Sequence, residues 1–247
     1  MGDAAMKRRI NEILARIHAV AAKRRGAART VKLVAVTKKF PPEVIEAAWR
    51  HGLHVFGENY VQEAVAKIEV LNARGYELEW HFIGHLQKNK AKRAVEYFDW
   101  IETVDSMDLL NRLIRLATTM KKEINTLVQV NISGDPGKAG LLPQDCLPFF
   151  REVAGKDLGP LRIRGLMTIT RFHEDPEEAR QWFRALRELR DRLVDSLRNA
   201  MALEHLSMGM SNDFEVAIEE GATIVRVGQA LFGPRPRSSK YEVNRDV

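Results

Sequence analysis

Residues 33–42 read Leu-Val-Ala-Val-Thr-Lys-Lys-Phe-Pro-Pro, an apolar run of strand length that ends in two lysines and a proline pair. The run predicts a strand, and the prolines predict its end. A strand that is apolar on both faces is typical of a parallel sheet covered by helices. Lys38 would then stand at the carboxyl end of this strand, where α/β folds carry their chemistry. The alternative is a lysine that only extends its ammonium group into water.

The rest of the chain alternates between short apolar segments and helical segments. We expect seven more strands, over residues 55–59, 79–84, 100–105, 126–132, 163–169, 205–210 and 223–228. Between them, apolar residues at helical spacing predict helices that include 42–51, 61–72, 143–154 and 176–198. This alternation implies a parallel sheet with right-handed crossovers.

Eight such units in 247 residues favour a single closed (β/α)8 barrel of the TIM type. The runner-up is an open, doubly wound sheet. No Gly-x-Gly-x-x-Gly follows the first strand, which disfavours the dinucleotide-binding version of that fold. Residues 5–25 predict an extra amphipathic helix that precedes the barrel and packs outside it. We therefore expect one domain over 1–247, with a core at about 30–233 and a polar tail over 234–247.

Composition and charge narrow the class of protein. Hydrophobic residues make up 45% and charged residues 29%, as in an ordinary soluble protein. The net charge of +6 suits anionic ligands, but the densest basic run, residues 88–93, has no interleaved aromatics, so we expect no nucleic-acid binding. The single cysteine, Cys146, excludes an internal disulfide and fits a reducing cytoplasm. No segment predicts a membrane span or a signal peptide.

In a barrel, all strands end at one mouth, and two of the loops there contain candidate anion-binding residues. The seventh strand runs into Gly209-Met210-Ser211-Asn212-Asp213, and the eighth runs into Gly228-Gln229. Glycine lets backbone N–H groups approach an anion, serine adds a hydroxyl, and a short helix follows each loop. Barrels often bind phosphate with the loops after these two strands. The sequence predicts a phosphate monoester site, with ordinary helix capping by residues 211–213 as the alternative.

A phosphate pocket that faces a strand-end lysine suggests a Schiff base. The ligand would carry an aldehyde and a phosphate, and pyridoxal 5′-phosphate (PLP) fits, with Arg226 near its ring. A sugar phosphate in an aldolase follows the same logic. His81 and His85 straddle a strand end and not a helix face, so we expect core or rim histidines and no metal site.

Together these stretches resemble the pyridoxal-phosphate homeostasis protein family, whose members are built like the N-terminal barrel of alanine racemase. The resemblance runs from about residue 30 to residue 233. The similar segments are 33–38, 56–63, 80–90, 165–168, 206–211, 225–228 and 231–233. Asn212 departs from the family pattern, since an acidic residue is common there.

The resemblance implies a role for each candidate site residue. Lys38 matches the lysine that forms the Schiff base, and Arg226 matches the arginine that faces the pyridine nitrogen. Asn59 would lie near the ring. The phosphate-binding positions and the wall beside them would be formed by Ser207, Gly209, Met210, Ser211, Gly228 and Gln229.

The resemblance also implies a function. Because arginine stays protonated and can only donate, it keeps the pyridine nitrogen unprotonated and the ring a poor electron sink. We expect a PLP-binding protein of intracellular cofactor homeostasis that holds PLP on Lys38 and buffers it or transfers it to PLP-dependent apo-enzymes, without robust catalysis. The alternative is a weak PLP-dependent amino-acid racemase. Racemases take a second base from a C-terminal β-domain that this sequence lacks, so we also expect a monomer.

Lys138 lies in the glycine-rich segment 134–140, which follows the fifth predicted strand and should be mobile. The same barrel mouth would hold this loop and Lys38. We therefore expect Lys138 to receive or guide the aldehyde during transfer.

Overall fold

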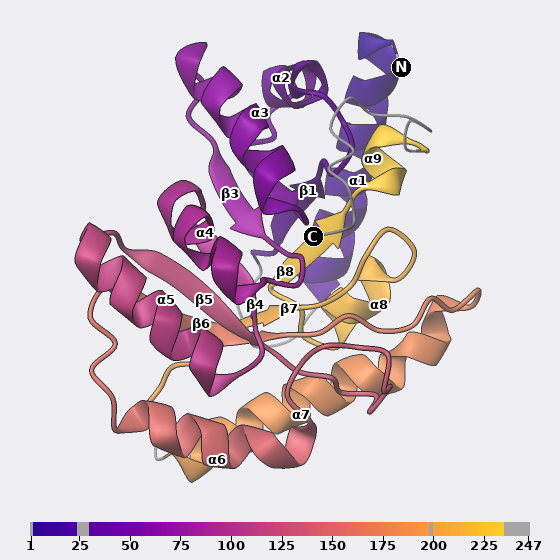
Figure 1. The fold of residues 1–247 in the computed structure, drawn as a ribbon. Helices are drawn as coiled ribbons and strands as arrows, with labels where there is room; N and C mark the ends of the chain where they lie inside the picture. Colours follow the sequence, from indigo (N-terminus) through magenta and orange to yellow (C-terminus); the bar gives the residue numbers. More distant parts are fainter. Residues whose placement is uncertain (1, 24–29, 198–199, 235–247) are drawn as a thin grey trace.

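The structure, a computed structural model, describes residues 2–23, 30–197 and 200–234. Eight parallel strands follow one another around a closed barrel in chain order (Figure 1). They are β1 (Lys32–Val36), β2 (Val55–Glu58), β3 (Glu79–Phe82), β4 (Trp100–Val104), β5 (Ile124–Gln129), β6 (Leu161–Met167), β7 (His205–Ser207) and β8 (Ile224–Val227). The pairing of β1 with β8 closes the ring. The predicted (β/α)8 barrel is thus confirmed.

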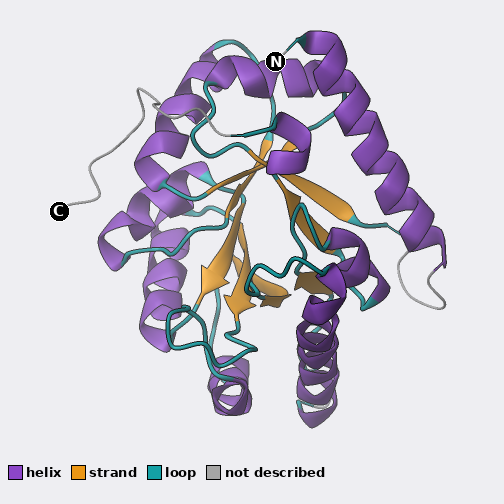
Figure 2. Ribbon diagram, turned by 90° about the vertical axis from the view of Figure 1, so that its right-hand side faces the viewer, coloured by secondary structure: helices purple, strands orange, loops and turns teal. Residues whose placement is uncertain are grey.

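Helices form an outer layer around the strands (Figure 2). They are α2 (Pro42–Arg50), α3 (Val61–Ala73), α4 (Ala91–Tyr97), α5 (Met107–Met120), α6 (Pro143–Ala154), α7 (Arg180–Ser196), α8 (Phe214–Glu219) and α9 (Gln229–Phe232). Two 3-10 turns, η1 (Lys88–Lys90) and η2 (Pro176–Ala179), lead into α4 and α7. Several helix starts follow known rules: proline opens α2 and α6, and Ser106 caps α5 by accepting a hydrogen bond from the Leu109 N–H.

The extra N-terminal helix, α1 (Asp3–Lys23), packs outside the barrel against α2, α8 and α9. Its apolar stripe of Ile10, Ile13 and Ile17 is buried. Arg16 on the same helix pairs with Glu215 of α8 at 2.6 Å. The helix packs outside the barrel, as the sequence predicts, and the structure adds that it covers the side where the first and last strands meet.

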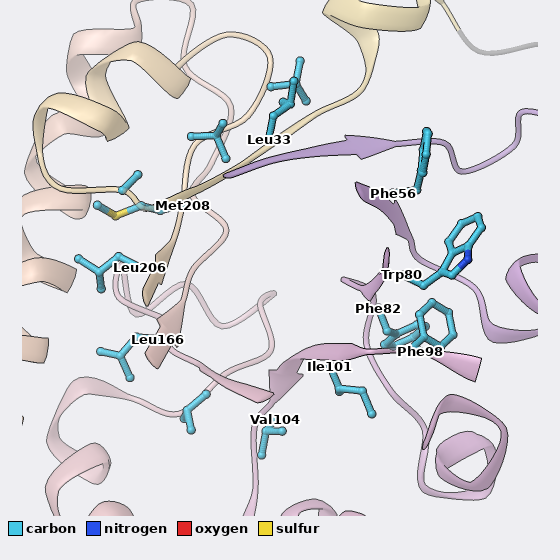
Figure 3. Close-up of a cluster of buried hydrophobic side chains, with 14 of the residues drawn as sticks. Leu33, Phe56, Trp80, Phe82, Phe98, Ile101, Val104, Leu166, Leu206 and Met208 are labelled. Carbon is cyan, nitrogen blue, oxygen red and sulfur yellow. The ribbon is translucent and has the colours of Figure 1, made fainter. Parts of the chain in front are cut away.

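Strand side chains alternate between two cores. One set points away from the strands toward the helices (Figure 3), and it includes Leu33, Phe56, Trp80, Ile101, Leu166 and Leu206. A second, smaller cluster fills the barrel interior and consists of Val34, Trp100, Leu127, Met167 and Ile224. The interior is not wholly apolar, because polar and charged side chains continue from this cluster toward the mouth.

Some predicted boundaries differ from the structure. Strands are predicted over 126–132 and 205–210, but β5 ends at Gln129 and β7 ends at Ser207. Two residues after β7, Gly209 has a φ of 90°, which no strand allows. The helix predicted over 176–198 is divided into η2 and α7. The predicted helix end at residues 24–25 and the polar tail from residue 235 on lie outside the described residues.

Candidate functional site

Lys38 lies in the turn between β1 and α2, two residues beyond the last residue of the strand. Along β1, Val34 belongs to the interior cluster, whereas Leu33 and Ala35 belong to the helix-facing core. Lys38 is partly buried. It follows the strand at its carboxyl end, where the mouth of a parallel barrel lies.

The two predicted phosphate loops meet at a single hydroxyl group. Ser211 Oγ, in the loop after β7, accepts hydrogen bonds from the backbone N–H groups of Gly228 and Ala230, both at 3.3 Å. The loop after β8 also lies close to β1, because a Cβ on Gly228 would come within 3.1 Å of the Val36 carbonyl oxygen. Backbone N–H groups and a hydroxyl therefore converge beside the end of β1, as an anion site requires.

Gly209 is the sharp corner of the loop after β7. Its φ of 90° suits glycine, and a Cβ there would lie 2.6 Å from the Cβ of Ala217. Its carbonyl oxygen accepts a hydrogen bond from the backbone N–H of Arg226 at 3.0 Å. The next residue, Met210, donates its N–H to Asp213 Oδ1 at 2.6 Å, so the acidic residue braces the loop without capping α8 through its side chain.

The other predicted site residues divide between the surface and the interior. Gln229 is the first residue of α9 and is exposed. Ser207 is fully buried inside the barrel, and its hydroxyl accepts a hydrogen bond from Arg226. Asn59 follows β2 directly, and its Oδ1 atom is buried with no hydrogen-bond partner among the described residues. A buried oxygen without a partner fits a ligand that donates to it.

Arg226 projects from β8 and is held by two bonds. Its Nη1 donates to Ser207 Oγ, and its Nη2 donates to the Thr168 carbonyl at 2.7 Å. Burial lowers the pKa of Arg226, and the carboxylate of Glu102, 3.9 Å away, opposes this effect. Since a guanidinium has five N–H donors, these bonds leave others for a ligand.

A chain of charged side chains runs from Arg226 down the barrel interior. Ser207 donates to Glu102 Oε2, and the other oxygen of Glu102 lies 2.5 Å from His81 Nδ1. The second ring nitrogen of His81 lies 2.6 Å from Glu79, which pairs with Lys32 at the start of β1. The interior thus holds alternating charges from the mouth to the opposite end.

His81 contacts a carboxylate through each of its ring nitrogens, and its pKa is shifted upward. Burial disfavours its charge, but the hydrogen bonds with Glu102 and Glu79 outweigh burial and raise the pKa of His81. The same contacts lower the pKa of Glu102 and lower that of Glu79 to about 2, although burial acts against both shifts. The sequence predicts a core or rim role for His81 and does not indicate its partners. A charged residue inside a buried strand, such as Glu102, is the signal that could have found them.

Several hydrogen bonds hold the loop that contains Lys138 in place. Its Nζ donates to the Ile169 carbonyl at 3.0 Å, and burial lowers its pKa. The Asn131 side chain bridges the loop by donating to the carbonyls of Asp135 and Lys138. The loop therefore lies beside the segment that follows β6, at the same mouth as Lys38.

The described part of the chain contains neither a metal site nor a reactive thiol. His85 is exposed and pairs with Asp105 at 3.4 Å, and the described residues contain no group of three or more potential metal ligands. Burial raises the pKa of the Cys146 thiol to about 12, which agrees with a packing role. No helix among residues 2–23, 30–197 and 200–234 has the length and apolarity needed to cross a membrane.

The fold and the site define a barrel of the alanine racemase N-terminal class. The profile of the family described as "Alanine racemase, N-terminal domain" matches residues 12–236. A racemase of Clostridium difficile shares the fold, with a TM-score of 0.66 over 93% of this chain and 60% of the racemase chain, at 14% identity. At that identity the likeness concerns the fold alone.

Two relatives of higher sequence identity have the same name. The pyridoxal phosphate homeostasis protein of Aquifex aeolicus is 42% identical over 92% of this chain and 97% of its own length. That of Escherichia coli K12 is 39% identical over 85% of this chain and 88% of its own length. PipY of Synechococcus elongatus, solved with PLP bound, superposes with a TM-score of 0.80 at 35% identity, over 92% of this chain and all of PipY. The chain belongs to the pyridoxal phosphate homeostasis protein family.

Proposed function

We propose that this protein binds PLP at the barrel mouth, attached to Lys38, and stores it for cofactor homeostasis without robust catalysis. The observation that supports it most is the placement of Lys38 at the end of β1, close to the hydroxyl and N–H groups where the loops after β7 and β8 meet. The name of the relatives and the PLP bound in PipY support the same ligand. PLP supplies an aldehyde, with which a lysine amine forms a Schiff base as water leaves.

Each part of the site would hold one part of the cofactor. Ser211, Gly228 and Gln229 would hold the phosphate with a hydroxyl and backbone N–H groups, while Gly209 and Met210 shape that wall. Ser207 fixes Arg226, whose guanidinium would donate to the pyridine nitrogen. Asn59 would accept a hydrogen bond beside the ring through its unpaired Oδ1.

Arg226 also argues against efficient amino-acid chemistry. A guanidinium donates a hydrogen bond but keeps its proton, so the pyridine nitrogen opposite it stays unprotonated. The ring is then a poor electron sink. Burial lowers the pKa of Arg226, and the nearby carboxylate of Glu102 opposes this lowering and so favours the charged guanidinium. The proposed role is therefore to bind the cofactor and to release it to PLP-dependent apo-enzymes, from a monomer in the cytoplasm.

Lys138 is the proposed second lysine in this transfer. Its lowered pKa leaves more of its amine uncharged than in water, and only an uncharged amine attacks an aldehyde. We expect Lys138→Ala to slow transfer of PLP to an apo-enzyme while Lys38 still binds PLP. Transfer rates equal to those of the unchanged protein would remove this role.

The visible absorption spectrum of the protein mixed with PLP tests the proposal, followed by borohydride reduction and peptide mass mapping. We expect a yellow species that reduction fixes on Lys38, and its loss in Lys38→Ala. Lys92→Ala, a change of an exposed lysine on α4, is the matched control and should leave the spectrum unchanged. A protein that takes up no PLP would overturn the proposal, and rapid α-proton exchange of alanine would favour a racemase.

A further inference from the structure

A buried cluster of three ionisable side chains lies beneath the turn that carries Lys38. Lys67 of α3 is fully buried, and its Nζ lies 2.8 Å from Glu58 Oε1 and 2.6 Å from Glu63 Oε1. Glu58 ends β2, and Glu63 lies in the first turn of α3. Both glutamates belong to segment 56–63, which the proposed PLP contacts use only through Asn59.

The cluster holds the backbone on both sides of Lys38. Lys67 Nζ donates to the carbonyl of Thr37 at 2.9 Å, and the N–H of Lys39 donates to Glu63 Oε1. These two groups belong to the two peptide units that flank Lys38. The turn between them is unusual, since Lys39 has a φ of 68°, a left-handed value that is rare outside glycine. Side chains from α3 therefore hold the backbone from which the lysine projects.

Stability alone does not account for such a cluster. Removing an ion from water costs several kcal/mol, and well-packed apolar residues often replace buried ion pairs without loss. Burial raises the pKa of Glu58 in spite of the nearby Lys67 ammonium, and its Oε2 has no hydrogen-bond partner among the described residues. The free-energy cost of burying these ions is explained if they hold the turn that carries Lys38 in one conformation.

We propose that Glu63 and Lys67 are positioning residues for Lys38. This inference rests on the proposed function, in which a ligand is fixed at two points, its phosphate beside Ser211 and its aldehyde carbon at the lysine. Because the ligand has one length, the lysine must start from a defined point. A turn that Glu63 and Lys67 no longer held would bind the phosphate end but would form and keep the bond to Lys38 poorly.

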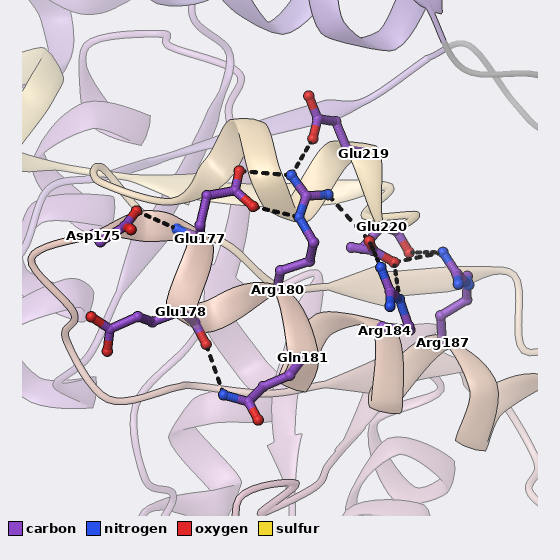
Figure 4. A network of polar contacts seen from close by, with 9 residues as sticks. All are labelled: Asp175, Glu177, Glu178, Arg180, Gln181, Arg184, Arg187, Glu219 and Glu220. Atoms are coloured by element: carbon purple, nitrogen blue, oxygen red, sulfur yellow. Dashed lines mark hydrogen bonds and ion pairs between the residues drawn. The ribbon is translucent and has the colours of Figure 1, made fainter.

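Three substitutions distinguish the hydrogen bonds that Glu63 and Lys67 make to the turn from the charges of these two residues. Glu63→Gln keeps an oxygen that can accept from the Lys39 N–H, Glu63→Leu removes it, and Lys67→Met removes the donor to Thr37. The matched control is Glu220→Gln, since Glu220 is a buried glutamate that binds Arg184 and Arg187 (Figure 4). It lies at the carboxyl end of α8, and none of these contacts involves the turn of Lys38. The control disturbs an equally dense ion network without touching the turn.

Three measurements are made on each variant: the rate of PLP loss after desalting, the pH at which the visible band changes, and the Tm without PLP. We expect Glu63→Leu and Lys67→Met to lose PLP at least about tenfold faster and to shift the pH midpoint of the band. The rate of PLP loss and the pH midpoint of Glu63→Gln should lie between those of these two variants and those of the unchanged protein. Glu220→Gln should lower only the Tm.

The outcomes distinguish this inference from the proposed function. If the unchanged protein takes up no PLP, the proposed function fails. If it binds PLP through Lys38 and the folded variants keep its rate of loss and its pH midpoint, the positioning role is overturned. Should Glu63→Leu and Lys67→Met not fold, Glu63→Gln decides, because a rate and a midpoint equal to those of the unchanged protein would contradict the role.

Discussion

At the scale of single residues, Arg226 is held in place from several sides. It is buried, and its guanidinium contacts Ser207, the Thr168 carbonyl and, at longer range, Glu102. A buried charge that loses its partner is costly because the remaining ion cannot be hydrated. The arginine therefore serves both the proposed ligand and the stability of the barrel interior.

Replacing Arg226 by glutamine tests this second role. Arg226→Gln should lower the free energy of unfolding by about 3 kcal/mol, because Glu102 would remain buried with less positive charge around it. Urea denaturation without PLP measures the change. Arg171→Gln is the control, since Arg171 is an exposed arginine paired with Asp135, and it should change stability little. Equal effects of the two substitutions would contradict the argument.

A second prediction at this scale concerns Gly209. Gly209→Ala should lower the unfolding free energy by about 2 kcal/mol and weaken PLP binding, because the φ of 90° and the contact with Ala217 both oppose a Cβ. Gly137→Ala is the control, since a Cβ there would meet only Asp135, at 3.5 Å. Thermal unfolding and PLP titration compare the two, and a Gly209→Ala protein that matches the control would sink the prediction.

At the scale of elements, the strands carry charges on their interior faces. Glu79 and His81 project from β3, and Glu102 projects from β4. Trp100 stacks on His81, with ring centroids 5.1 Å apart, and lies under the ammonium of Lys32. Neighbouring strands are thus joined inside the barrel by ion pairs as well as by their backbone ladders.

The lowered pKa of Glu79 gives a prediction of pH dependence. A carboxyl whose pKa falls from 4.5 to about 2 on folding binds fewer protons in the folded than in the unfolded protein. Its contribution to stability is therefore present above about pH 4.5 and is lost as the pH falls toward about 2. Glu79→Gln should flatten the fall of unfolding free energy in this window, which urea denaturation at several pH values measures. An unchanged slope would refute the assignment.

At the scale of the whole molecule, the barrel brings the first strand and the last two strands together. β1 pairs with β8, Gly228 after β8 lies against Val36 at the end of β1, and Ser211 in the loop after β7 accepts the Gly228 backbone N–H. α1 covers this side by packing on α2, α8 and α9. A ligand that joins Lys38 to the loop of Ser211 would therefore link the two ends of the closed sheet.

Ligand binding should consequently stabilise the entire fold. PLP at about 100 times its Kd adds about 2.7 kcal/mol to the unfolding free energy, which for a chain of this size raises the Tm by roughly 5 to 10 °C. Lys38→Ala should show a much smaller rise, because the covalent bond is lost and only the non-covalent contacts to the phosphate and the ring remain. Differential scanning fluorimetry measures both proteins, and an equal rise in Lys38→Ala would contradict attachment at this lysine.

The barrel, the place of Lys38 at a strand end and the two glycine-containing loops could be predicted from the sequence. Strand-length apolar runs alternate with helical ones, and parallel strands bring all their carboxyl ends to one mouth. Family membership was predicted from the motifs and is confirmed by the relatives. The binding roles of the individual site residues stay predictions.

Only the tertiary structure decided which polar side chains meet. The sequence predicts Ser207 beside the phosphate loops but does not indicate its hydrogen bonds to Arg226 and to Glu102, which is 105 residues away in the chain. Lys67, inside α3, was not predicted to contact the turn of Lys38. Spacing determines which face of a strand or helix a residue occupies, but which faces meet depends on the register of eight strands once the barrel closes.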